Sequence, residues 1–168
     1  APLGVRKADH PRRPVVIGSG PAGLFCALEL ARAGYRPIIL ERGDDVETRG
    51  KAISSFWTGS DLDPESNMQF GEGGAGTYSD GKLTASGNDE LGRNRAVLDE
   101  FAAAGAPAEI LYASKPHIGT DYLVKVVRNI RSAIESLGGE VRFRARVAAL
   151  VMKDGRVAGV ELADGERI

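Results

Sequence analysis

Residues 15–23 read Val-Val-Ile-Gly-Ser-Gly-Pro-Ala-Gly, a β-branched triplet followed by a turn with three glycines. Apolar residues at helical spacing continue as far as Gly34, and a second apolar run ends in Glu41. This order predicts a strand, a tight turn, a helix and a second strand, the βαβ unit that binds dinucleotides. The predicted fold class is therefore α/β, built on a parallel sheet.

Each glycine of the turn has a separate expected role. Gly18 permits the tight turn, Gly20 lets the backbone approach a pyrophosphate, and Gly23 lets the helix pack close to the strand. The helix N-terminus then faces the phosphates with free amides and a positive dipole end. Glu41 is placed to accept hydrogen bonds from ribose hydroxyls, and its charge favours FAD or NAD over NADP. The alternative, a βαβ unit without a ligand, leaves three glycines and an acid unexplained.

Composition limits the other classes of function. The chain has 168 residues, 42% of them hydrophobic, which suits a single domain. Its net charge of −1 gives no reason to expect nucleic acid or an anionic membrane as a partner. No apolar stretch approaches the ~18 residues of a membrane span, so a cytoplasmic location is expected. The single cysteine, Cys26, is expected to be a buried structural thiol.

The rest of the chain divides into few segments. Residues 1–13 read as a basic tail or linker, and residues 14–168 as one domain with a long glycine-rich excursion over 42–92 that lacks a regular pattern. Helices are expected over 93–104 and 120–137, followed by a strand over 140–151, a turn at 153–156 and a returning strand over 157–162. The prediction is a parallel sheet extended by an antiparallel meander and incomplete at its C-terminal end, as in a fragment of a longer protein.

Three stretches together resemble a known family. They are the turn with its flanking strands, the loop Asn-Met-Gln-Phe-Gly-Glu-Gly-Gly-Ala-Gly-Thr-Tyr-Ser-Asp-Gly-Lys-Leu at 67–83, and Lys-Pro-His-Ile-Gly-Thr-Asp at 115–121. They are similar to a bacterial family of FAD-dependent dehydrogenases within the glutathione-reductase-like FAD superfamily. The resemblance implies a Rossmann-like FAD-binding domain and an oxidoreductase that moves hydride or electrons between an organic substrate and flavin. A non-catalytic dinucleotide-binding module and an NAD-only dehydrogenase remain as alternatives.

The resemblance also implies which residues hold the cofactor. It places the glycine-rich loop, residues 71–82, beside the isoalloxazine, where backbone amides could stabilise the negative charge of reduced flavin; a flexible surface loop is the alternative. Val147 matches a position whose backbone meets the adenine in similar flavoproteins, although it could equally be an ordinary strand valine. Arg49 is a candidate for the pyrophosphate. The full expected set of cofactor-binding residues is Gly18, Ser19, Gly20, Pro21, Ala22, Gly23, Glu41, Arg42, Arg49, Gly73, Gly74, Ala75, Gly76 and Val147.

Catalytic residues are less well marked. His117 could transfer a proton coupled to hydride transfer, but a structural hydrogen bond to the loop is favoured. Lys82 could contact the ring or a substrate, with a helix N-cap or salt-bridge role as the alternative. The sequence shows no clustered metal ligands and no Ser-His-Asp or Cys-His set. The expected partners are a small-molecule substrate and an electron donor, for which NAD(P)H is one candidate.

Overall fold

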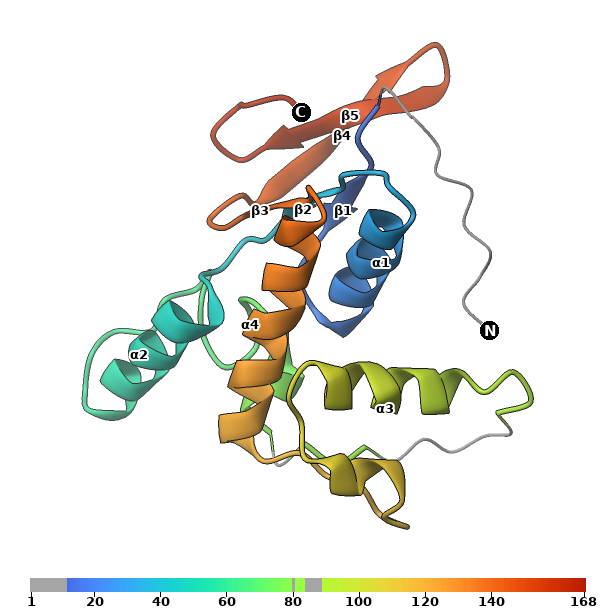
Figure 1. Ribbon diagram of the computed structural model, residues 1–168. Coiled ribbons are helices and arrows are strands. Elements are labelled where there is room, and N and C mark those ends of the chain that lie inside the picture. The colour runs from blue at the N-terminus through green and yellow to red at the C-terminus, as the bar shows by residue number, and fades with distance from the viewer. Residues whose placement is uncertain (1–11, 80, 84–88) are drawn as a thin grey trace.

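A three-stranded parallel sheet lies at the centre of the computed structural model, which describes residues 12–79, 81–83 and 89–168 (Figure 1). Its strands are β1 (Val15–Ile17), β2 (Ile38–Leu40) and β3 (Glu140–Arg142), with β2 in the middle. Helix α1 (Pro21–Arg32) connects β1 to β2, and α4 (Thr120–Ser136) leads into β3. The predicted βαβ unit and α/β fold class are confirmed.

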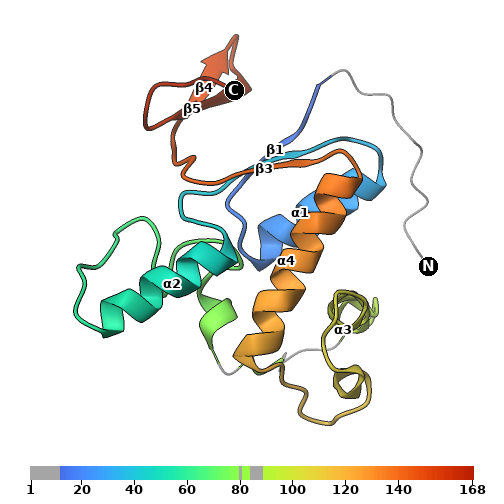
Figure 2. The same cartoon turned by 60° about the vertical axis from the view of Figure 1, so that its left-hand side comes forward.

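Different elements cover the two faces of the sheet (Figures 1 and 2). Helices α1 and α4 lie on one face, where Ile39 joins their apolar side chains in the main core. The antiparallel hairpin of β4 (Val147–Lys153) and β5 (Arg156–Leu162) lies on the other, where Ile38 and Leu40 pack with Val160 and Leu162. Neighbouring residues of a strand point to opposite faces, so β2 contributes to both cores. The predicted antiparallel strands are confirmed, but they form a separate two-stranded sheet rather than extending the parallel one.

The remaining elements lie around the helical layer. They are α2 (Val46–Trp57), the 3-10 helix η1 (Ala75–Tyr78), α3 (Arg93–Ala103) and the 3-10 helix η2 (Ala108–Leu111). Helix α3 is joined to α1 by an edge-on contact of Phe25 with Phe101, 5.5 Å between ring centroids, and by an ion pair of Arg32 with Glu100.

The excursion over 42–92 contains a helix that the sequence did not predict. Helix α2 begins after Asp45, whose carboxylate accepts hydrogen bonds from the amides of Glu47 and Thr48 and so caps the helix. Only Val46, Arg49 and Ile53 of this helix are buried. Such a narrow buried stripe, with Gly50 in its middle, gives a weak helical pattern in the sequence.

The strand predicted over 140–151 is in fact two strands in different layers. Strand β3 ends at Arg142 and β4 begins at Val147, and between them Arg144 has a φ of +55°. Its guanidinium pairs with Asp44 and Asp63, which holds the chain in this bend. The alternation of apolar residues and arginines continues through the bend, so periodicity alone could not reveal it.

The structure also bears on the expectations for Cys26 and for the N-terminal tail. Cys26 is exposed rather than buried, because it lies on the outer face of α1. Most of the expected tail, residues 1–11, lies outside the described residues. Arg13, at its end, donates to Glu140 at 2.7 Å and so attaches this segment to the start of β3.

Candidate functional site

The glycine turn after β1 is shaped as the dinucleotide motif requires. Gly18 has a φ of +88°, and a Cβ on Gly23 would lie 2.0 Å from the Gly18 carbonyl oxygen. Around Gly20, by contrast, nothing lies within 4 Å of the position of a Cβ, and no side chain caps the N-terminus of α1. Gly18 and Gly23 therefore serve the fold, whereas the space at Gly20 and the uncapped helix end suit an anion.

The carboxylate of Glu41 lies beneath this turn and is 4% exposed. Its Oε2 accepts hydrogen bonds from the amide and hydroxyl of Ser19, at 2.8 and 2.7 Å, and its Oε1 accepts one from the Gly43 amide at 2.9 Å. An ionised carboxylate offers about four acceptor positions, so about one remains for a ligand hydroxyl. Glu41 thus ties the turn to the chain after β2, a structural role that sequence reasoning missed.

An open cavity of about 430 Å³ lies where these residues meet. It combines segments that are far apart in the sequence: the glycine turn, the end of β2, the segment before η1 and the start of β4. Six of the expected cofactor residues line it, namely Gly18, Gly20, Glu41, Arg42, Gly74 and Val147. It is also lined by Gly71, which belongs to the loop expected beside the isoalloxazine, and by residues that were not predicted, namely Ile17, Leu40, Gln69, Phe70, Ala145 and Arg146.

One side of this cavity carries aromatic and charged groups. The Arg42 guanidinium lies over the Phe70 ring, 4.2 Å from its centroid, and donates to Glu65 at 2.8 Å. Arg146 also reaches toward Glu65, at 3.8 Å. The Arg42 guanidinium holds the pKa of Glu65 below its usual range. The Phe70 ring and the planar guanidinium are suited to stacking against a flat base.

Arg49 is placed differently from the expectation that it reaches the pyrophosphate. It is fully buried, and its guanidinium donates to backbone carbonyls of the segment 67–74. Burial lowers its pKa from the ordinary value. Arg49 therefore acts on this segment and does not line the cavity.

The glycine-rich loop lies directly against the glycine turn. The Gly73 amide donates to the Ser19 carbonyl at 2.9 Å, and the Gly74 amide donates to Gly71 at 3.0 Å, so these two donors are used within the protein. Among the described residues, the amides of Ala75 and Gly76 have no protein acceptor. They open η1 and remain available to a ligand.

The remaining expected residues lie around the cavity. Ser19 is buried beneath it, and Pro21, Ala22 and Gly23 form the first turn of α1. Pro21, Gly73, Gly76 and Lys82 line a smaller, mainly apolar cavity of about 140 Å³ between α1, α4 and η1.

The two catalytic candidates lie opposite each other. Lys82 and His117 form an isolated antiparallel bridge, and both are exposed. The bridge joins the end of the glycine-rich loop to the segment before α4, a structural role of the kind the sequence left open. Asp80, within the same loop, lies outside the described residues.

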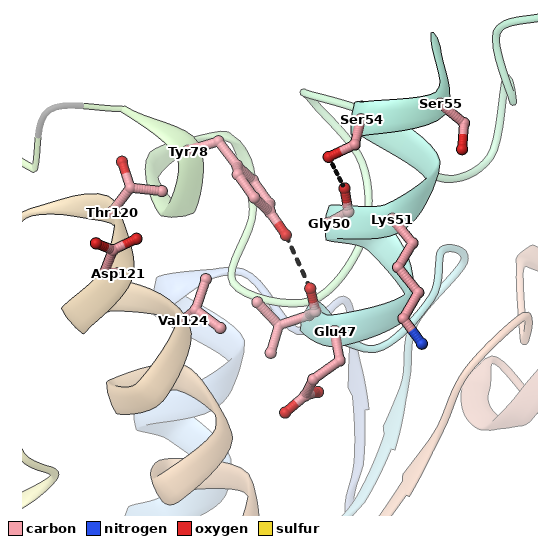
Figure 3. Close-up of a pocket in the computed structure, with 10 residues that line it drawn as sticks. Glu47, Gly50, Lys51, Ser54, Ser55, Tyr78, Thr120, Asp121 and Val124 are labelled. Atoms are coloured by element: carbon pink, nitrogen blue, oxygen red, sulfur yellow. Dashed lines mark hydrogen bonds between the residues drawn. The ribbon is translucent and has the colours of Figure 1, made fainter. Parts of the chain in front are cut away.

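A second groove, of about 570 Å³, lies between α2 and α4. Figure 3 shows Tyr78 between the two helices, with Lys51 on the α2 side and Asp121 on the α4 side. The Tyr78 hydroxyl donates to the Val46 carbonyl at 2.8 Å, and burial raises the Tyr78 pKa. None of the site residues predicted from the sequence lines this groove.

Two kinds of feature are absent from the part of the chain that the structure describes. It contains no group of three or more His, Cys, Asp or Glu side chains that could hold a metal ion. None of its helices is long and apolar enough to cross a membrane.

Comparison with known families identifies the class of protein. Residues 14–117 match the family described as FAD dependent oxidoreductase, and the chain belongs to this family. The expectation of an FAD-dependent oxidoreductase class, with FAD as its cofactor, is confirmed. The matched residues include the glycine turn, Glu41 and the glycine-rich loop.

Individual relatives match different lengths of the chain. A protein of Clostridium beijerinckii (strain ATCC 51743 / NCIMB 8052) is 53% identical over 156 residues, which cover 93% of this chain and 29% of that protein. An L-amino-acid oxidase of Bungarus fasciatus is 46% identical over 46 residues, 27% of this chain and 9% of the oxidase. The chain thus spans less than a third of the length of these relatives.

Solved structures share the fold. Glycine oxidase from Bacillus cereus ATCC 14579 superposes with a TM-score of 0.58 at 15% identity, covering 91% of this chain and 52% of that one. The THI4 protein of Thermovibrio ammonificans gives a TM-score of 0.54 at 22% identity, covering 89% and 46%. At these identities the likeness concerns the fold alone.

Proposed function

We propose that the described domain holds FAD and that the whole protein is an oxidoreductase that passes hydride or electrons between a small organic molecule and this flavin. The observation that supports this best is the cavity of about 430 Å³, in which the glycine turn, Glu41, Gly74 and Val147 meet. FAD, when bound, supplies the redox chemistry, and the protein supplies binding, orientation and charge stabilisation.

The chain offers groups suited to each part of an ADP moiety. The open space at Gly20 and the uncapped end of α1 would take the pyrophosphate. The remaining acceptor position of Glu41 would take a ribose hydroxyl. Arg42, Phe70 and the backbone of Val147 would border the adenine.

The glycine-rich loop would serve the flavin end. The amides of Ala75 and Gly76 would donate to the ring system and would stabilise negative charge on reduced flavin. Positioned donors of this kind are worth a few kcal/mol to a developing charge. Lys82 and His117 lie at the end of this loop and would approach a substrate from there.

The absorbance of the purified full-length protein tests this proposal. A flavin spectrum that bleaches with a reductant and recovers with an acceptor is expected, together with release of FAD on denaturation, identified by mass spectrometry. A bound flavin that no acceptor reoxidises would favour the non-catalytic binding module. Release of NAD without flavin would favour the NAD-only dehydrogenase.

The electron donor and the cellular location belong to the same proposal. NAD(P)H is one candidate donor, and anaerobic mixing with NADH and with NADPH should bleach the flavin if either reduces it. A cytoplasmic location predicts that cell fractionation recovers the protein with cytoplasmic markers. Bleaching by neither nucleotide would leave an organic substrate as the source of electrons.

A further inference from the structure

One side chain holds the backbone of the segment 67–74 together. Arg49 extends from α2, and its Nε donates to the carbonyl of Asn67 at 2.8 Å while Nη2 donates to that of Met68 at 3.0 Å. Its Nη1 donates to the carbonyls of Glu72 and Gly74, at 2.7 and 2.8 Å. A segment outside regular helix or sheet must satisfy its carbonyl groups by other means, and here one buried guanidinium donates to five of them, the fifth being that of Gly71.

The surroundings of Arg49 leave little room for another arrangement. A Cβ on Gly71 would lie 2.5 Å from the Arg49 Cδ, and Gly71 has a φ of +117°. The Tyr78 ring packs against the guanidinium, 4.9 Å from its centroid, while its hydroxyl donates to the Val46 carbonyl. Gly50 allows this contact, because a Cβ there would lie 3.0 Å from the Tyr78 hydroxyl.

The segment that Arg49 holds is also a wall of the cofactor cavity. Gly71 and Gly74 line the cavity, and both accept from Nη1 of Arg49, Gly71 at the longer distance of 3.4 Å. Gly74 has a φ of +68°, and the position of its Cβ is 3.4 Å from Pro21 and 3.5 Å from Gly20. The Arg49 side chain therefore lies behind this wall, one peptide group away from the cavity.

We propose that Arg49 is a positioning residue for the cofactor, which fixes the segment 67–74 against the glycine turn and places a positive charge behind the wall that faces the pyrophosphate. The ligand in this inference rests on the proposed function, whereas the effect on the segment does not. A lysine would keep the charge but not the role, since its compact ammonium cannot direct donors at carbonyls in several directions.

The test compares Arg49→Lys with the wild type in the full-length protein. We expect the dissociation constant of FAD to rise about tenfold or more, as for the loss of at least one hydrogen bond from a charged group. The flavin absorbance should also shift. Amide hydrogen exchange should speed up at residues 67–76 more than in β2 or α4. Ile53→Ala is the control for lost packing in the same helix, because Ile53 is buried there but its side chain cannot donate hydrogen bonds to the segment.

Two outcomes would overturn the inference. The first is an Arg49→Lys protein that melts at a lower temperature, as Ile53→Ala should, but keeps the wild-type FAD affinity and spectrum. The second is unchanged exchange at residues 67–76. If the wild type binds no FAD, the proposed function fails, and hydrogen exchange still decides whether Arg49 orders the segment. Should Arg49→Lys not fold, Gly71→Ala disturbs the same contact from the loop side and should give the same exchange pattern.

Discussion

At the scale of single residues, Gly20 and Gly23 have different roles within one turn: Gly20 leaves space for a ligand, and Gly23 allows the turn to pack. A side chain on Gly20 would enter the cavity, whereas one on Gly23 would collide with the Gly18 carbonyl. We expect Gly20→Val to fold with wild-type circular dichroism and to lose FAD, since its backbone φ of −67° suits any residue. Flavin content per mole of folded protein measures this.

The matched control is Gly23→Ala, for which we expect a marked loss of thermal stability. A Gly20→Val protein that retains FAD normally would show that the dinucleotide binds elsewhere.

Glu41 has two roles that a pair of substitutions can separate. Glu41→Gln keeps the size of the side chain but removes the charge that accepts three protein donors and, in our proposal, a ribose hydroxyl. We expect FAD binding to weaken by about 1–3 kcal/mol, as for hydrogen bonds to a charged group, in an isothermal titration. Ser19→Ala removes one donor to Glu41 without touching the ligand and should mainly lower stability. Equal FAD affinities in the two variants would argue against the ribose contact.

At the scale of elements, Glu72 connects the glycine-rich loop to two helices. It is fully buried, its Oε2 accepts from the Val46 amide at the start of α2, and its Oε1 lies 3.2 Å from Nε of Arg131 in α4. These last two atoms form no directed hydrogen bond. Burial raises the pKa of Glu72 from 4.5 to about 7, so the charged form is disfavoured in the folded protein.

A pH dependence of stability follows from this carboxyl. The folded protein holds the proton up to about pH 7 and the unfolded chain releases it near 4.5, so the contribution of Glu72 to stability falls as pH rises through this window. The change is about 3 kcal/mol. Glu72→Gln should remove this part of the fall, as measured by urea denaturation across the window. Parallel curves for wild type and variant would mean that Glu72 is ionised throughout.

The elements also show how far the sequence predicts the fold. Helix α4 was predicted because Leu123, Val126, Val127, Ile130 and Ile134 form a continuous apolar stripe, and all five are buried. Helix α2 was not predicted, because one of its three buried side chains, Arg49, contacts the backbone of the segment 67–74 instead of an apolar core. A guanidinium that binds carbonyl groups leaves no pattern in the sequence.

At the scale of the whole molecule, the cavity is assembled from parts that only tertiary structure brings together. The glycine turn and Glu41 were predicted because they lie close together in the sequence, at a spacing typical of the motif. Phe70 and Arg146 were not predicted. Phe70 lies in a segment without regular structure, and Arg146 follows the bend at Arg144. The quoted loop 67–83 already contained Phe70, but no local rule directs its ring toward Arg42.

The hairpin connects the stability of the molecule to its cavity. Leu162 is buried against β2, and it pairs with Val147, which lines the cavity. Leu162→Ala should cost about 2–5 kcal/mol of unfolding free energy, as for truncation in a packed core, measured by urea denaturation. It should also weaken FAD binding, because Val147 packs against the same apolar cluster and loses a neighbour that holds β4 over the sheet. Val157→Ala is the control, since Val157 is 60% exposed on the same hairpin and should change stability by about 0.5 kcal/mol or less. Equal losses in the two variants would show that the hairpin does not act as a packed layer, and unchanged FAD affinity in Leu162→Ala would place the adenine away from β4.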